Sequence, residues 1–425
     1  MVSNGGSAAA ALALSSGAAI DETSISYAGV TSASLNPRTD VLTVYSGGVT
    51  HAVQLSGNLQ GASLGLSSDG SGGTEIVNLG VSPQVTGPVS PATTRQQTVI
   101  LAGSNLQFVN TYTSNVSTGY QDAIVTAENF YQSQIANTAT LNFNFDTAPG
   151  VGAGTNSYST VSASFSQLET ALSNLATSAD DRAAVAAISA LAGHFAGSTF
   201  EIADPLAQVL GLPGATAGTI DTTQLDSTLS YFYNQSSPTP NALDAVAILE
   251  HEISEGAFGR LGGDGSTNGI MDLFRYAGAG VLDTSLGRDG RAAYLSIDGT
   301  QLLTQFHNPF SPGVPSDGGD SADWDASGTN QQPTYIAGQS NAYDAYGVTT
   351  DGAIGMVTST DLRVLDVLGW TLAAMGPIKP ATSDFNGNGL SDLVWRNANG
   401  DAGIWLTTAD GGYTPVDFGV IDTNW

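Results

Sequence analysis

The sequence contains no cysteine among its 425 residues, which excludes disulfides, thiolate zinc sites and a cysteine nucleophile. Positive charge is also scarce, because ten Lys+Arg stand against 38 Asp+Glu and Lys379 is the single lysine. The formal net charge of -28 produces a field that repels nucleic acid and anionic membranes and attracts cations. We therefore expect no nucleic-acid partner.

Long apolar runs are missing too. No stretch reaches the ~20 apolar residues that a membrane-spanning helix needs, so we expect no membrane span. With 11% charged residues and 52 glycines, the surface must consist largely of Ser, Thr, Asn and Gly, which is typical of loop-rich and strand-rich extracellular proteins. The Ala/Leu run near the N-terminus has no positive charge before it, so a cleaved signal peptide is not indicated. We expect a secreted bacterial monomer exported by a route independent of a signal peptide.

The pattern along the chain predicts an α+β protein with three regions. Residues 1–95 combine a low-complexity start, a small β unit and a Pro/Thr/Ser-rich linker; residues 96–375 form the main domain; residues 376–425 are a β-rich tail. In the main domain, the alternation of apolar residues at 141–145 predicts a half-buried strand. Apolar spacing predicts helices at 120–135, 165–176, 183–192 and 359–369, the last capped by Ser359 or Thr360.

The most informative segment is 243–263, LDAVAILEHEISEGAFGRLGG, which reads as a helix that stops at Gly262-Gly263. His251 and Glu255 are four positions apart and so would lie one turn apart on the same helical face, where they could hold one metal ion. Glu252 would stand beside that ion and take a proton from bound water. This is the geometry of the H-E-x-x-H metalloprotease motif, with Glu255 in place of the second histidine.

Each of these residues also has a purely structural interpretation. His251 could be a satisfied core histidine, and Glu255 could form an ion pair with Arg260 on an exposed face. Glu252 and Glu255 could instead be the paired carboxylates of a polysaccharide-active enzyme, although glycosidases usually place these groups on separate elements ~5–9.5 Å apart.

The tail contains a candidate calcium loop, DFNGNGLSD at 384–392. Oxygen ligands recur at alternate positions and glycines permit the tight turn, as in an EF-hand loop that lacks the glutamate at position twelve. The predicted calcium ligands are the following: Asp384, Asn386, Asn388, Leu390 and Asp392. The competing interpretation is an Asn/Gly hairpin turn without an ion. Because the chain stops at Trp425 within what we interpret as one repeat, we expect a longer natural protein.

Four sequence blocks resemble metzincin-type secreted bacterial metalloproteases: EHEISEGAFGR at 250–260, MDLFRYAGAG at 271–280, AYLSIDG at 293–299 and STDLRVLDVLGW at 359–370. The resemblance implies a metzincin-like domain in which the third ligand histidine falls on Asp323 and the methionine beneath the metal falls on Tyr343. The tail is similar to the FG-GAP/VCBS calcium-binding repeats that such enzymes often carry. His307 is the rival third ligand, and the neighbouring acids Asp320 and Asp325 could replace Asp323. Tyr276 is a candidate for polarising the scissile carbonyl.

One imidazole and two carboxylates leave a bound divalent ion roughly neutral, so they should lower the pKa of bound water less than three histidines would. Oxygen ligands also shift preference from zinc toward manganese, iron or calcium. The leading hypothesis is a secreted metalloendopeptidase acting on proteins or peptides, with zinc or another divalent metal at His251, Glu255 and Asp323. The alternatives are a non-catalytic calcium-binding adhesin on a protease-like fold and the polysaccharide-active enzyme.

Overall fold

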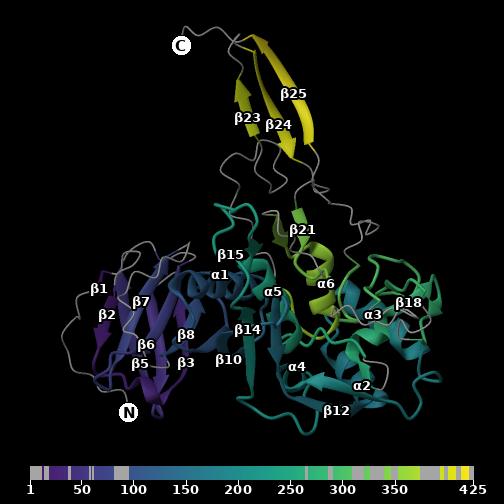
Figure 1. Ribbon diagram of the computed structural model, residues 1–425, viewed down its shortest axis with the longest axis horizontal. Helices are drawn as coiled ribbons and strands as arrows, with labels where there is room; N and C mark the ends of the chain where they lie inside the picture. The colour runs from purple at the N-terminus through teal and green to yellow at the C-terminus, as the bar shows by residue number, and fades with distance from the viewer. Residues whose placement is uncertain are drawn as a thin grey trace. The chain divides into compact units, whose positions relative to one another are not determined.

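The computed structural model describes residues 12–13, 19–36, 40–56, 59, 62–80, 95–263, 267–285, 291–308, 320–325, 339–345, 353–373, 393–396, 401–407 and 413–420. These residues form a mixed α+β structure with several separate sheets, as the sequence predicts (Figure 1). The chain divides into two compact units, residues 1–372 and residues 373–425. The second unit contains an antiparallel sheet of β23 (Leu393–Arg396), β24 (Asp401–Thr407) and β25 (Tyr413–Val420).

The first unit is built on one eight-stranded sheet with the order β11-β14-β10-β9-β8-β6-β7-β2. Its strands are β2 (Ala19–Glu22), β6 (Ser63–Ser68), β7 (Thr74–Gly80), β8 (Arg95–Leu101), β9 (Leu106–Tyr112), β10 (Ala139–Ala148), β11 (Gly154–Ser157) and β14 (Ile220–Asp226). The pairs β9–β10 and β10–β14 are parallel, whereas β11 lies antiparallel to β14 at the edge. This edge of the sheet is the one nearest the candidate site.

The strand predicted at 141–145 lies within β10, and its alternation decides which side chains enter the core. Leu141, Phe143 and Phe145 are buried, while the residues between them are only partly buried. Helix α1 (Thr118–Gln134) packs on this face, with the Tyr120 ring edge-on to Phe145 at 6.4 Å. Helix α5 (Ala245–Gly256) packs against α1, β11 and β14, so the motif helix is held between a helix and the end of the sheet.

The N-terminal strands join the same sheet. Strands β2, β6 and β7 extend it beyond β8, and a second sheet of order β1-β5-β4-β3 packs over them. The strands of that second sheet are β1 (Leu12–Ala13), β3 (Val30–Asn36), β4 (Val41–Ser46) and β5 (Val49–Ser56). A separate hydrophobic core lies between the two layers and includes Leu42, Val44, Leu64, Leu66 and Ile100. Residues before 95 therefore share backbone hydrogen bonds with the strands that follow them.

The remaining elements are shorter helices, 3-10 turns and short strands. The other helices are α2 (Phe165–Leu175), α3 (Ala179–Ala190), α4 (Asp204–Val209), α6 (Ser359–Val367) and the 3-10 turns η1 (Tyr27–Gly29) and η2 (Ile270–Phe274). The short strands are β12 (Thr160–Ser164), β13 (Thr199–Ala203), β15 (Tyr231–Phe232), β16 (Leu243–Asp244), β17 (Asn268–Gly269), β18 (Arg275–Gly278), β19 (Val281–Leu282), β20 (Tyr294–Leu295), β21 (Gln339–Asn341) and β22 (Ile354–Met356).

Several predicted helix boundaries are wrong. Helix α3 begins at Ala179, four residues before the predicted start at 183, because Ser178 and Asp181 form a capping box there. The motif helix ends at Gly256 and not at the Gly262-Gly263 pair, because the chain turns and reaches a positive φ of 77° at Gly259. Helix α6 is capped by Thr358, one residue before the predicted cap; its hydroxyl accepts from the Asp361 amide, and the Asp361 carboxylate accepts from the Thr358 amide. This reciprocal pair forms the capping box that an S/T-x-x-D spacing permits.

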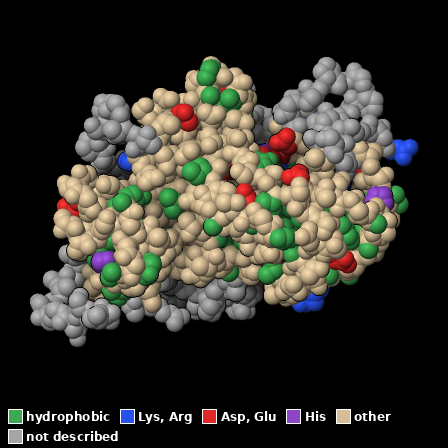
Figure 2. Space-filling model, turned by 90° about the horizontal axis from the view of Figure 1, so that it is seen from below, with side chains coloured by type: hydrophobic (Ala, Val, Ile, Leu, Met, Phe, Trp, Pro, Cys, Tyr) green, Lys and Arg blue, Asp and Glu red, His purple; other side chains and the backbone are tan. Residues whose placement is uncertain are grey.

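The surface has the uncharged character that the composition predicts. On the face shown in Figure 2, most of the area comes from backbone and uncharged polar side chains, with scattered acidic groups and few basic ones. Among the described residues, no helix is long and apolar enough to cross a membrane.

Candidate metal centre

Helix α5 supplies two of the three residues that converge at the candidate centre. The helix starts where the Asp244 carboxylate accepts hydrogen bonds from the amides of Val246 (3.0 Å) and Ala247 (3.3 Å), two groups that a helix start leaves without partners. His251 and Glu255 then lie one turn apart on one face. Every residue of α5 except His251 is buried, so this is an interior helix with one partly open position.

Asp323 reaches the centre from a segment far away in the sequence. Its backbone carbonyl accepts a hydrogen bond from the His307 amide at 2.7 Å, and the next amide, that of Trp324, donates to the Tyr343 carbonyl at 3.0 Å. The indole N–H of Trp324 donates to the Asp361 carboxylate of α6 at 2.7 Å. These bonds fix the backbone on both sides of Asp323, so its carboxylate is held opposite α5.

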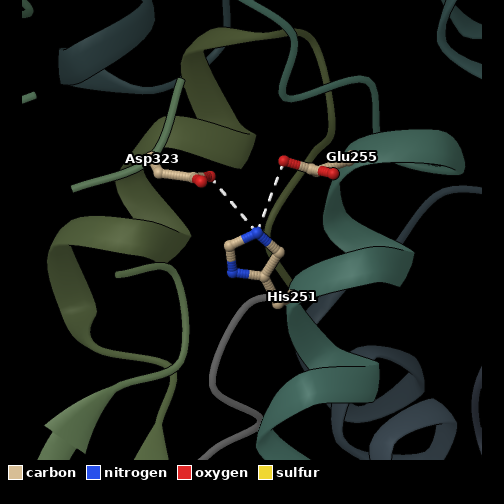
Figure 3. A group of neighbouring side chains, drawn as sticks. All are labelled: His251, Glu255 and Asp323. Carbon is tan, nitrogen blue, oxygen red and sulfur yellow. Dashed lines mark ion pairs between the residues drawn. The ribbon is translucent and has the colours of Figure 1, made fainter. Parts of the chain in front are cut away.

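The three side chains meet at the His251 ring. His251 Nε2 lies 3.2 Å from Asp323 Oδ1 and 3.4 Å from Glu255 Oε1, with both carboxylates directed at the same nitrogen (Figure 3). The three ligand atoms lie within 4.8 Å of one another, so the group could hold a metal ion. The structure thus brings together the three residues that spacing and resemblance indicated.

The tautomer of His251 explains why this arrangement requires a cation. His251 Nδ1 lies 2.8 Å from the Ala342 carbonyl oxygen, so Nδ1 must carry a hydrogen in order to donate. In the neutral ring, Nε2 therefore presents a lone pair to two carboxylate oxygens. Such an arrangement is repulsive unless a positive group lies among the three atoms: a metal ion, a proton on Nε2, or the Arg260 guanidinium, whose Nη2 lies 3.3 Å from Nε2. The backbone carbonyl that orients the ring is the kind of outer partner that histidine ligands of metals usually have.

Electrostatics around the ring act in the same sense. Burial lowers the pKa of His251, but the carboxylates of Asp323 and Glu255 outweigh burial and raise it well above its usual value. Burial raises the pKa of Asp323, whereas His251 and Arg260 together hold it well below its usual range. The centre therefore favours a charged carboxylate facing a positive partner.

Arg260 is the fourth charged member of the cluster, and its side chain is fully buried. Its guanidinium donates to Asp323 Oδ1 at 3.0 Å and to Glu255 Oε1 at 3.3 Å, and its Nη2 lies 3.3 Å from His251 Nε2. The predicted pairing of Glu255 with Arg260 is thus present, although in the interior and not on an exposed face. The EGAFGR spacing placed Arg260 near Glu255, but no sequence pattern indicated that it would also contact Asp323.

Glu252 lies beside the cluster under the edge strand. A Cβ on Gly154 of β11 would fall 2.8 Å from Glu252 Oε1, so the strand passes over the carboxylate at a position where only glycine fits. The side-chain amide of Asn156 donates a hydrogen bond to the Glu252 backbone carbonyl at 2.7 Å, which holds β11 close to α5. Burial, followed by Glu255, raises the pKa of Glu252 well above its usual value. A raised pKa moves a carboxyl group from its usual acidic range toward the range in which general bases work.

Two further acidic groups approach the centre: Asp320, which the sequence offered as a substitute for Asp323, and Asp221, which no sequence pattern indicated as a site residue. Burial, followed by Glu255, raises the pKa of Asp320 to about 7. The same two causes raise the pKa of Asp221 well above its usual value, and within the described part of the chain neither oxygen of Asp221 makes a hydrogen bond of normal geometry. Asp221 belongs to β14, where an acidic residue at an inward position interrupts the apolar alternation. That interruption is the sequence feature that could have indicated Asp221 as a site residue.

Tyr343 forms the floor of the centre, in the place where the resemblance puts it. Its ring lies edge-on to His251 at 6.4 Å between centroids and beneath the Arg260 guanidinium at 4.5 Å. Its hydroxyl is 2.9 Å from that of Tyr131 on α1, which in turn donates to the Glu250 carbonyl. The floor is therefore tied to the backbone of α5.

The other candidate residues lie elsewhere. His307 is buried and contacts Asp323 through the backbone, but its ring does not belong to the three-residue group. Tyr276 belongs to β18 and pairs with Leu282 of β19. Its hydroxyl faces Gly299, where an added Cβ would lie 3.1 Å away. The Gln305 amide donates to Asp325, one of the acids that could have replaced Asp323. The predicted calcium ligands Asp384, Asn386, Asn388, Leu390 and Asp392 lie outside the described residues.

Comparison of the chain with protein-family models, with curated proteins and with solved structures gave no match. The functional interpretation therefore depends on the geometry of the centre.

Proposed function

We propose that the protein is a secreted metal-dependent endopeptidase. Its centre would consist of His251, Glu255 and Asp323, with Glu252 as the general base. The observation that supports this most directly is the convergence of His251 Nε2, Asp323 Oδ1 and Glu255 Oε1 within 4.8 Å of one another. One imidazole nitrogen and two carboxylate oxygens form a donor set suited to zinc, manganese or iron.

The role of each residue follows from its position. A divalent ion at this centre would act as a Lewis acid and lower the pKa of a water molecule. Glu252, buried next to the ligands, accepts the proton of the attacking water on a carboxylate oxygen and later returns it to the leaving amine. The Ala342 carbonyl keeps His251 Nε2 directed at the centre. Tyr343 packs below the ring and limits its movement.

An extended peptide is the substrate that the fold suits best. Strand β11 is the edge of the eight-stranded sheet and packs against α5, and within the described part of the chain no strand pairs with its outer side. An added peptide strand there would pass over Glu252 and place a backbone carbonyl at the centre. This pairing recognises main chain and is tolerant of side-chain sequence.

The proposal predicts peptide hydrolysis that depends on both the metal and Glu252. We expect the purified protein to cleave casein or a quenched fluorescent peptide, to lose this activity in a chelator and to regain it with zinc or manganese. Glu252→Gln should keep the metal and lower kcat by about 10²–10⁴-fold, because it removes the proton acceptor alone. Glu169→Gln on α2 is the matched control and should leave the rate unchanged. Hydrolysis that survives both the chelator and Glu252→Gln contradicts the proposal.

A second candidate is a non-catalytic extracellular scaffold, and the Arg260 contacts favour it. Arg260 already supplies a positive group to Glu255 and Asp323, so the cluster is charge-compensated without a metal ion. Under this alternative, purified protein hydrolyses no peptide with any added divalent ion. Release of sugar that a chelator does not inhibit would instead favour the polysaccharide-active enzyme.

A further inference from the structure

Arg260 makes more hydrogen bonds at the centre than a simple ion pair with one carboxylate would. Beyond its two carboxylate partners, Nε donates to Ser254 Oγ at 2.9 Å and Nη1 donates to the Ala322 carbonyl at 2.9 Å. The Tyr343 ring lies against the guanidinium face. The fork of Arg260 is therefore fixed on every side, and its charge stays at the centre.

The atoms that Arg260 contacts are the metal ligands themselves. Asp323 Oδ1 and Glu255 Oε1 are the two oxygens directed at His251 Nε2 in Figure 3, and the same two oxygens accept hydrogen bonds from Arg260. Nη2 also lies 3.3 Å from Nε2. One guanidinium thus contacts all three ligand atoms from a fully buried position.

A cation in this position opposes a second cation. With the imidazole neutral, as metal binding requires, the three ligands carry a charge of about -2, and Arg260 reduces the charge that the metal ion meets to about -1. Water is largely excluded, so the repulsion between guanidinium and metal is weakly screened. Each carboxylate oxygen has lone pairs for both partners, so the two cations share the oxygens and compete for their charge.

We propose that Arg260 is a built-in cation that weakens divalent-metal binding at His251, Glu255 and Asp323 and keeps these three side chains together when the metal is lost. This rests on the proposed function, since it assigns the determinant of metal affinity at that same centre. Arg260 is a positioning residue: it contacts the ligands and not the reacting atoms. By compensating one carboxylate, it also leaves the loaded centre more positive than a two-carboxylate site alone would be.

Removing the charge of Arg260 should therefore strengthen metal binding. We expect Arg260→Met to bind zinc and manganese about tenfold or more tightly than the parent chain, measured by isothermal titration of the full-length protein. Metal ions that bind elsewhere on the protein are identified with the His251→Ala variant, and their number is subtracted from the total for each chain. Arg260→Lys, which keeps the charge but not the fork, should lie between Arg260→Met and the parent. Arg363→Met is the matched control, because Arg363 pairs with Asp180 outside the centre.

The melting temperature is a second test of the role of Arg260, and it does not require enzymatic activity. Without metal, Arg260→Met removes one of the two positive partners, Arg260 and His251, that face the two buried carboxylates, so it should unfold at a lower temperature than the parent. Added zinc should raise its melting temperature by more than it raises that of the parent, because the metal replaces the lost cation. If Arg260→Met does not fold even with zinc, Arg260→Lys carries the test, and an affinity no higher than that of the parent contradicts the inference.

The results separate this inference from the proposed function. Zinc binding by the parent and tighter binding by Arg260→Met support both. Binding by Arg260→Met with none by the parent supports the role of Arg260 and overturns the metalloenzyme proposal. Equal or weaker binding by Arg260→Met, with normal binding by the parent, overturns the role of Arg260 and leaves the function standing. Binding by neither chain contradicts both.

Discussion

At the scale of single residues, the buried carboxylates of this protein differ in whether a cation compensates them. Asp323 faces His251 and Arg260, and these two groups keep its pKa well below the usual range. Glu128 on α1 is also fully buried, but among the described residues its carboxylate accepts a hydrogen bond only from the Asn110 side-chain amide, at 3.0 Å. Burial raises the pKa of Glu128 well above its usual value. A buried acid of this second kind makes stability depend on pH.

The sign of that dependence can be tested with Glu128→Gln. Because the folded-state pKa of Glu128 is raised, the folded chain holds a proton that the unfolded chain releases above about pH 4.3, so Glu128 destabilises the fold progressively as the pH rises toward the folded-state value. We expect Glu128→Gln to be more stable than the parent by roughly 1–3 kcal/mol at pH 8 and similar to it at pH 4. Urea unfolding at the two pH values measures this. A stability difference that does not change with pH would show that Glu128 is not protonated in the fold.

Part of the centre could be predicted from the sequence. The four-residue spacing of His251 and Glu255 indicated a shared ligand position, since helical periodicity fixes which side chains lie on one face. Asp323 is 68 residues further along the chain than Glu255, so spacing alone could not connect the two. The resemblance to metzincin-type proteases indicated Asp323 as the third ligand. Arg260 follows the end of α5, and only the tertiary turn at Gly259 returns its side chain to the ligands.

At the scale of elements, the centre depends on how closely α5 approaches the sheet. Gly256 ends α5 and faces Asp221 of β14, where an added Cβ would lie 1.9 Å from Asp221 Oδ2. Gly154 permits the corresponding close approach of β11 to Glu252. These two glycines let the helix and the edge strand come together at the ligand-bearing turn.

Gly256→Ala should therefore destabilise the protein by roughly 1–3 kcal/mol, because the new methyl group overlaps a buried carboxylate. The Asp221→Ala change creates room for that methyl. We expect the double variant to be clearly more stable than the sum of the two single effects predicts, in a double-mutant cycle followed by chemical unfolding. Strict additivity would mean that α5 and β14 are not in contact at this point.

Whether an element could be predicted depended on its hydrophobic period. Strand β10 alternates Leu141, Phe143 and Phe145 toward the core, and the pattern predicted it. Strand β14 shows no apolar alternation in the sequence, because two of its inward positions are Asp221 and Thr223. Burying polar side chains there removes the apolar period that identifies a strand. The residue that conceals the strand is one that lies close to Glu255.

At the scale of the whole molecule, the sheet joins regions that composition alone would separate. Residues 1–95 were expected to form their own small β unit, yet β6 pairs with β8, and both strands belong to the sheet that ends at β11. The tail is different, because residues 373–425 form a compact unit of their own.

Two truncations test this organisation. A chain of residues 1–373 should unfold with the same midpoint as the full chain, since the first unit keeps its cores. A chain that begins at residue 95 loses β6, one of the two strands that pair with β8, and the facing sheet, so we expect it to be insoluble or to unfold without a cooperative transition. Circular dichroism and calorimetry distinguish these outcomes. A stable, cooperative chain from residue 95 onward would show that the N-terminal strands are dispensable.

The central claim is that one divalent ion binds between His251, Glu255 and Asp323. The most direct measurement is anomalous diffraction from crystals of the full-length protein grown with zinc, recorded on both sides of the zinc absorption edge. The account predicts an anomalous peak about 2.0–2.3 Å from His251 Nε2 and from one oxygen of each carboxylate. Density in which the Arg260 guanidinium alone bridges Glu255 and Asp323, with no peak at His251, would contradict it.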